Sequence, residues 1–169
     1  KIAIYRAVIV PKLMYNLCTL WVLNAEISKL NYFHVKCLRR IAKILPAYVS
    51  RVSNEAVLKQ VGERQLSVDL HIAQLALWGH IVRRPDGHPA RLVCFKPGGL
   101  ALQGTIGKRR MGHPFKNWIR EVTREAFLIG KAMETESGRP TPSSERLLVL
   151  ASDRNSWRDS IRRLCTSSV

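Results

Sequence analysis

Apolar residues recur at helical spacing along most of this chain, and the clearest case is residues 27–45. A helix over this stretch would place one apolar stripe on a core and turn a row of cations to the opposite face. The stripe is Ile27, Leu30, His34, Cys37, Leu38, Ile41 and Leu45. The opposite face carries Lys29, Lys36, Arg39, Arg40 and Lys43. Asn24 is the expected N-cap of this helix and Pro46 its expected end.

The same spacing predicts further helices before and after this one. Residues 2–23 form an apolar helix that bends or restarts at Pro11, although its charges make it a poor membrane span. Ser53 caps a short helix over 54–61, which Gly62 ends. The remaining expected helices cover residues 65–83, 114–134, 145–151 and 153–165.

One stretch favours strands instead of a helix. Residues 91–96 are β-friendly, Pro97-Gly98-Gly99 is turn chemistry, and residues 100–106 can return as a weak hairpin. The predicted fold is therefore mostly α, an irregular multi-helix bundle with at most one small β-hairpin at about residues 90–106. We expect three segments, 1–48, 49–136 and 137–169, with a Gly/Pro/Ser linker at the start of the third.

The net charge of the chain predicts the kind of partner that it binds. The 169 residues include 28 Lys and Arg against 12 Asp and Glu, a net charge of +16. Self-repulsion at this level disfavours a compact state unless a polyanion relieves it, so nucleic acid is the first expected partner and an anionic membrane surface the second. Residues 1–50 carry eight bases and one acid, whereas residues 134–169 are nearly balanced. The C-terminal segment is therefore expected to be mainly structural.

The most basic loop is Gly107–Trp118, in which Lys108, Arg109 and Arg110 stand between two glycines. Pro114 suits the first turn of the following helix, whose N-terminus would add backbone N–H donors behind the cations. Such an arrangement suits phosphate, although a solvated basic loop is the simpler alternative. The predicted nucleic-acid contacts come from this loop and its helix, from the end of helix 65–83 and from the cationic face of helix 27–45. They are Lys108, Arg109, Arg110, Lys116, Arg120, Arg83, Arg84, Lys36, Arg39, Arg40 and Lys43.

Catalytic and metal-binding motifs find little support in the sequence. His34 and Cys37 lie one turn apart, but a packed core histidine beside a small thiol is a better interpretation than a metal site. We interpret His80 mainly as a structural residue at a helix end, and the alternative is that it acts as a ligand or a base. Neither a P-loop nor a catalytic triad order is present, and the acids are scattered. We therefore expect no enzymatic activity, no cofactor and no metal.

Five ordered motifs together resemble a known family. They are Tyr5, Pro11, Tyr15 and Trp21; Arg39-Arg40-Ile41; Gly79-His80 with Arg83; the Gly107–Trp118 loop; and Ala151, Asp153, Arg154, Trp157 and Arg158. In this order they are similar to the thumb and downstream helical region of non-LTR retrotransposon reverse transcriptases. Gln74 and His113 stand where that family usually has Arg. The family's catalytic palm lies upstream of this region and has no counterpart in these residues.

The resemblance implies a thumb-like first segment, residues 1–48, and a module that holds RNA or a hybrid duplex. We expect a non-catalytic RNA-binding protein of retroelement origin, a structural part of a ribonucleoprotein such as a mitochondrial ribosome, contacting RNA phosphates and neighbouring proteins. One alternative is a fragment of an active reverse transcriptase, and another is a helical protein–protein scaffold. Because the first residue is Lys, the chain is expected to be a fragment or a processed form.

Overall fold

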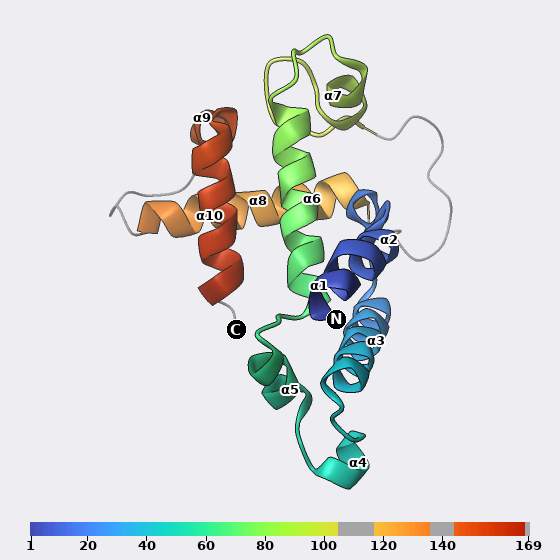
Figure 1. Cartoon of the computed structure of the whole chain (residues 1–169). Coiled ribbons are helices and arrows are strands. Elements are labelled where there is room, and N and C mark those ends of the chain that lie inside the picture. Colours follow the sequence, from blue (N-terminus) through green and yellow to red (C-terminus); the bar gives the residue numbers. More distant parts are fainter. Residues whose placement is uncertain (105–116, 136–143, 168–169) are drawn as a thin grey trace. The chain divides into compact units, whose positions relative to one another are not determined.

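Helices make up most of the chain, as the sequence predicts (Figure 1). The computed structural model describes residues 1–104, 117–135 and 144–167. Internal contacts divide the chain into two units, Lys1–His71 and Ile72–Val169, and the division falls inside a helix. This boundary is placed differently from the three segments expected from composition.

Unit 1, residues Lys1–His71, begins with a helical segment shorter than predicted. Val10 N–H donates to Tyr5 O in a π-helical turn directly before Pro11, so the expected irregularity at the proline is present. The helix ends at Met14 and not at residue 23, because Asn16 adopts a left-handed conformation with φ of 59°. The elements are α1 (Ile2–Ile4), the π-helical turn (Tyr5–Ile9), α2 (Val10–Met14) and a 3-10 turn (Leu17–Thr19).

The cationic helix of the sequence is α3 (Asn24–Ala42), and both of its ends differ from the prediction. It begins one residue earlier, at a Leu23 N-cap, where Glu26 Oε2 accepts a hydrogen bond of 2.9 Å from Leu23 N–H. It ends before Leu45, because Lys43 takes a left-handed conformation with φ of 58°. Leu45 is consequently exposed, which corrects its predicted place on the buried stripe.

Two further helices complete unit 1. α4 (Ala47–Ser50) follows Pro46, and α5 (Asn54–Val61) has the predicted bounds. Ser53 Oγ accepts from Ala56 N–H at 3.1 Å, and Gly62 has φ of 70°, so both the predicted cap and the predicted stop are confirmed. The first residues of α6 (Leu66–Val82) also belong to this unit. Its buried cluster is Tyr5, Val35, Leu38, Val57 and Leu58.

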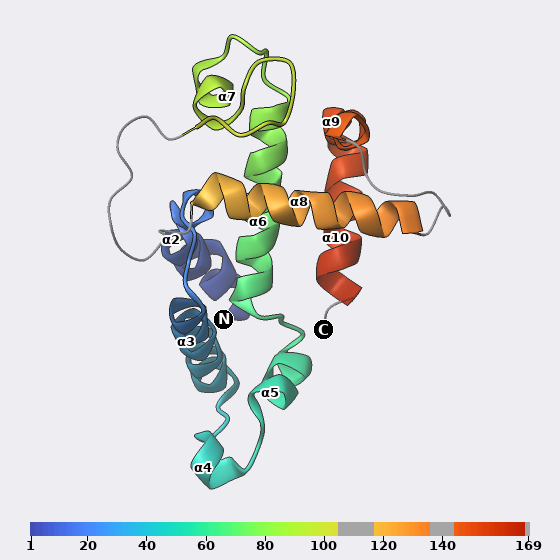
Figure 2. The same cartoon turned by 180° about the vertical axis from the view of Figure 1, so that it is seen from behind.

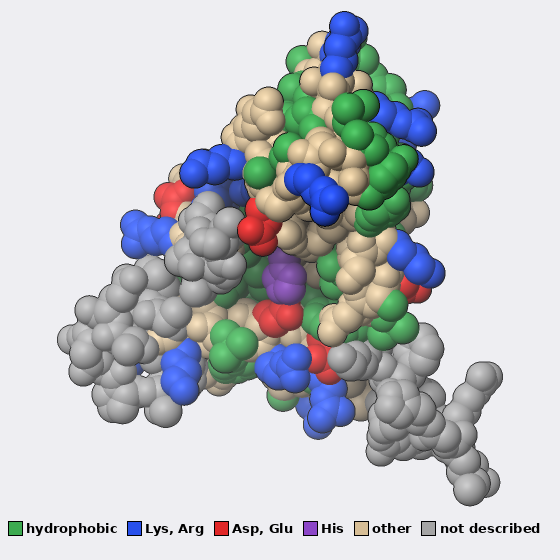
Figure 3. Space-filling view, turned by 90° about the horizontal axis from the view of Figure 1, so that it is seen from below, with side chains coloured by type: hydrophobic (Ala, Val, Ile, Leu, Met, Phe, Trp, Pro, Cys, Tyr) green, Lys and Arg blue, Asp and Glu red, His purple; other side chains and the backbone are tan. Residues whose placement is uncertain are grey.

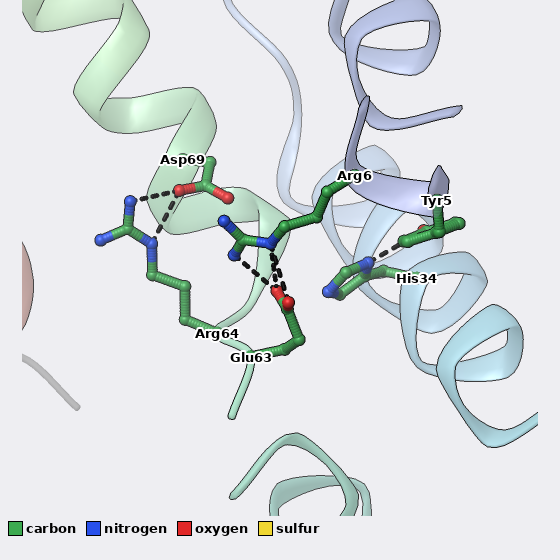
Figure 4. A network of polar contacts seen from close by, with 6 residues as sticks. All are labelled: Tyr5, Arg6, His34, Glu63, Arg64 and Asp69. Atoms are coloured by element: carbon green, nitrogen blue, oxygen red, sulfur yellow. Dashed lines mark hydrogen bonds and ion pairs between the residues drawn. The ribbon is translucent and has the colours of Figure 1, made fainter. Parts of the chain in front are cut away.

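A polar network joins the start of the chain to α3 and to the α5–α6 turn (Figure 4). Tyr5 Oη lies 2.9 Å from His34 Nδ1, and burial raises the pKa of Tyr5 to about 12. Arg6 Nε donates to both oxygens of Glu63 at 2.7 and 2.8 Å. His34 is therefore a packed core histidine, as predicted.

Unit 2, residues Ile72–Val169, is built around the second part of α6. Figures 1 and 2 show α8 running across α6 and α10. Trp78 of α6 is fully buried, its Nε1 donating to Thr123 Oγ1 at 2.9 Å, and its ring lies 5.1 Å from that of Trp157. The further elements of this unit are α7 (Pro89–Cys94), α8 (Trp118–Thr135), α9 (Ser144–Ser152) and α10 (Arg154–Ser167).

The predicted strand at residues 91–96 is wrong, because most of it belongs to α7. His88 Nδ1 accepts from Ala90 N–H and Pro89 takes the first helical position, so local capping outweighs the β-friendly composition. The chain still turns at 97–99 and forms one isolated antiparallel bridge, Phe95 to Leu102, without a strand in the described part. Among the described residues, none of the helices has the length and apolar character that a membrane crossing requires.

Candidate nucleic-acid interface

A groove of about 450 Å³ in unit 1 collects three of the predicted nucleic-acid contacts. It lies between the second half of α3 and the α4 turn. Lys36 and Arg40 are exposed at positions one helical turn apart, so both present charge at the same face of α3. The lining consists of Tyr32, Val35, Lys36, Arg39, Arg40, Ile44, Pro46, Ala47, Tyr48 and Asn54, and this set contains no carboxylate.

Two tyrosines of the groove are not among the residues that the sequence predicts for the site. Tyr32 is 63% exposed and Tyr48 is 81% exposed, although tyrosine side chains in folded proteins are ordinarily at least partly buried. The Lys36 ammonium lies 6.0 Å from the centre of the Tyr32 ring, at cation–π range. Residues 32, 36 and 40 are spaced by four, so the sequence did contain a signal for Tyr32. Tyr48 had no such signal, because its place depends on the turn after α3.

Arg39 corrects the predicted cationic face. It is buried, with 7% exposure, and its guanidinium holds the chain that follows α3. Nη1 donates to Leu45 O at 3.0 Å, and Nη2 donates to Val52 O at 2.6 Å and to Asn54 Oδ1 at 3.1 Å. These bonds fix the wall of the groove, so Arg39 positions the site instead of offering an exposed phosphate contact.

Two further predicted contacts that the structure describes are not part of this lining. Lys43 is exposed at the left-handed end of α3, outside the lining, and Arg120 is exposed on α8 in unit 2. On the face drawn in Figure 3, Lys and Arg side chains recur over much of the surface beside exposed hydrophobic patches. Lys108, Arg109, Arg110 and Lys116 lie outside the described residues.

In unit 2, Arg83 and Arg84 are placed at the C-terminal end of α6. Arg83 is half-buried and its Nη1 donates to Ala151 O of α9 at 2.9 Å. Arg84 is exposed, and its Nη2 lies 2.8 Å from His80 Nε2. Since arginine has only donors, the histidine nitrogen accepts this bond. His80 therefore supports the helix end, in line with its predicted structural role, although its partner is a guanidinium and not a carbonyl.

A second cleft, of about 410 Å³, lies between α6 and α10 within unit 2. His80 and Arg83 line it from α6, and Arg154 and Arg158 line it from α10. The nearly balanced net charge of the C-terminal segment predicts a mainly structural role for it. The net charge of the whole segment does not reveal Arg154 and Arg158, which lie on one side of α10 because they are four residues apart.

The close approach of α6 and α10 depends on a glycine. A Cβ on Gly79 would lie 2.5 Å from Cδ1 of Trp157, so only glycine leaves room for that ring. Trp157 is 1% exposed, and its Nε1 donates to Leu75 O at 3.0 Å. Two of the motifs that carry the family resemblance, Gly79-His80-Arg83 and Arg154-Trp157-Arg158, thus meet in one place.

Comparison of the chain with protein-family models, with curated proteins and with solved structures finds no match.

Proposed function

We propose that this chain is a non-catalytic RNA-binding protein of retroelement origin, which serves as a structural component of a ribonucleoprotein. The single observation that carries the proposal is the groove of unit 1, where exposed cations and exposed tyrosines line the same hollow. Single-stranded nucleic acid is bound by this combination, because cations follow the phosphates and aromatic rings stack on the bases.

The side chains of the groove have different roles in this proposal. Lys36 and Arg40 supply phosphate contacts, and Tyr32 and Tyr48 supply faces on which unpaired bases stack. Stacking is worth about 1–3 kcal/mol per base and tolerates any base, so we expect low sequence specificity. Arg39 keeps the groove open through its bonds to the backbone after α3.

The test is fluorescence anisotropy of a labelled, unstructured RNA over a range of salt concentrations. Replacing both Lys36→Gln and Arg40→Gln should lower the slope of log K against log salt by about 1.4, since each single-strand phosphate contact contributes about 0.7. The matched control is Lys29→Gln with Lys59→Gln, which removes the same charge from exposed positions of unit 1 outside the lining. Equal losses in both double variants would mean that binding follows net charge alone, and the groove would not be the site.

The tyrosines separate RNA binding from nonspecific charge attraction. Tyr48→Ala should weaken binding by roughly tenfold or more, whereas Tyr48→Phe keeps the ring and should bind nearly as well as the parent chain. The side chain is 81% exposed, so neither change should alter stability. An affinity that is indifferent to Tyr48→Ala at every salt concentration would contradict stacking in the groove.

A further inference from the structure

The cleft between α6 and α10 brings together more positive charge than its surroundings balance. His80, Arg83, Arg154 and Arg158 line it, and the rest of the lining is apolar: Ile72, Ala76, Trp157 and Ile161. The lining contains no carboxylate. Three guanidiniums around one hollow repel one another unless an anion lies between them.

The electrostatics of the cleft show that repulsion. Burial, and next the charge of Arg154, lower the pKa of Arg83, while Asp153 acts in the opposite direction. Desolvation and the charges of Arg84, Arg83 and Arg154 lower the pKa of His80. Asp153, the acid that acts on Arg83, is already engaged at the start of α10, where its two oxygens accept from Asn155 N–H and Ser156 N–H at 3.1 Å each.

Packing and hydrogen bonds within unit 2 hold the frame of the cleft. Gly79 lets the Trp157 ring pack directly on α6, and the Trp157 Nε1 bond to Leu75 O holds that ring in place. Arg83 is held from the side by its bond to Ala151 O. Arg83 is therefore positioned before any ligand arrives, which reduces the ordering cost of binding, and Arg154 and Arg158 extend from a helix that Trp157 packs against α6.

We infer that the α6–α10 cleft is a binding site for a terminal phosphate carried on a nucleotide unit. Guanidiniums bind phosphate oxygens through paired N–H donors, and a phosphomonoester carries nearly two negative charges near pH 7, against one for a phosphodiester. The volume suits a ligand of nucleotide size, and Ile72, Ala76 and Ile161 offer an apolar wall for a sugar or base. The inference goes beyond the proposed function, because the groove of unit 1 takes no part in it.

Calorimetric titration of the full chain with uridine 5′-monophosphate tests the site, with uridine as the ligand that lacks the phosphate. We expect saturable binding of the nucleotide and none of uridine. Arg154→Gln with Arg158→Gln should weaken nucleotide binding by at least about tenfold, because charged hydrogen bonds are lost. Both side chains are exposed, so the variant should keep the parent melting temperature. The control, Lys96→Gln with Lys131→Gln, removes the same charge from exposed positions of unit 2 outside the cleft.

The His80 imidazole reports the location of the ligand. A bound dianion should raise its pKa, so its ring resonances should titrate at higher pH in the presence of the nucleotide. This signal would stay unchanged if the nucleotide bound only in the groove of unit 1, and that result would overturn the inference without touching the proposed function. Equal affinity for uridine and the nucleotide, or an equal loss in the control variant, would overturn it as well.

Two sources of the phosphate are separated by a third ligand, a 5′-phosphorylated tetrauridylate, measured in the Lys36→Gln and Arg40→Gln background. Tighter binding than the mononucleotide identifies an RNA end as the ligand, and weaker binding identifies a free nucleotide. Both results uphold the phosphate site, provided that the 5′-hydroxyl form of the same oligonucleotide binds less tightly. Equal affinity of the two forms would overturn it.

Discussion

Replacing Gly79 by alanine should destabilise unit 2, because the added methyl has no room between α6 and α10. The new Cβ would lie 2.5 Å from Trp157 Cδ1, closer still to Nε1, and 3.1 Å from Arg83 Nη1. The ring cannot move away without losing its bond to Leu75 O and its contact with Trp78. Gly79 is thus the point at which a single methyl tests the packing that forms the cleft.

The expected loss combines two costs and one gain. Overpacking a dense core costs about 1–3 kcal/mol, and a buried indole N–H without its acceptor costs about 1–3 kcal/mol. The higher helix propensity of alanine returns about 1 kcal/mol. The middle of each range gives a net loss of roughly 3 kcal/mol, which lowers the melting temperature of a chain of 169 residues by about 6–12 °C.

Thermal unfolding followed by circular dichroism and tryptophan fluorescence measures this loss. Gly87→Ala is the matched control, because a Cβ there meets nothing within 4 Å, and its melting temperature should stay at or slightly above that of the parent. Adding Trp157→Leu to Gly79→Ala should cost less than the sum of the single changes, since the two residues compete for the same space. A Gly79→Ala chain as stable as the parent would refute the packing of α10 on α6.

Three further changes test local features of unit 1. Burial lowers the pKa of His34, so the folded chain favours its neutral form. The free energy of unfolding should therefore be full above about pH 6.5 and fall on acidification by at most about 1.4 kcal/mol per pH unit. Urea titrations at several pH values should show a weaker pH dependence for His34→Gln. Arg39→Lys should lower the free energy of unfolding by about 1–3 kcal/mol, because one ammonium nitrogen cannot replace both guanidinium nitrogens at their separate acceptors. Exposed Arg40→Lys should be nearly neutral in the same urea experiment. Ser53→Ala should cost about 1 kcal/mol through the lost cap of α5, and a smaller change than about 0.3 kcal/mol would contradict that assignment.

Features that depend on neighbouring residues could be predicted from the sequence. The bounds of α5 follow from Ser53 and Gly62, because a cap and a left-handed stop act within a few residues. The β-friendly side chains of residues 91–96 favour a strand, but the helix-start signal of His88 and Pro89 outweighs them. That signal is local, so the start of α7 is also a feature that the sequence can predict.

Features that depend on distant segments could not be predicted. Periodicity placed Arg39 on the exposed face of α3, but the chain from Leu45 to Asn54 returns over it and supplies three acceptors for its guanidinium. The cleft of unit 2 needs a helix end and a helix start that are about 70 residues apart in the sequence, and only their packing through Gly79 joins them. Net charge per segment describes neither arrangement, because a binding site depends on where charges meet.

The central claim is that RNA lies in the groove between α3 and α4. Ultraviolet cross-linking of the full chain to uridine-rich RNA at about 150 mM salt, followed by mass spectrometry of the peptides, tests it most directly. The account predicts RNA adducts on Tyr32 or Tyr48, and their loss when Lys36 and Arg40 are both replaced by Gln. Adducts confined to other parts of the chain, or no adduct at this salt concentration, would contradict it.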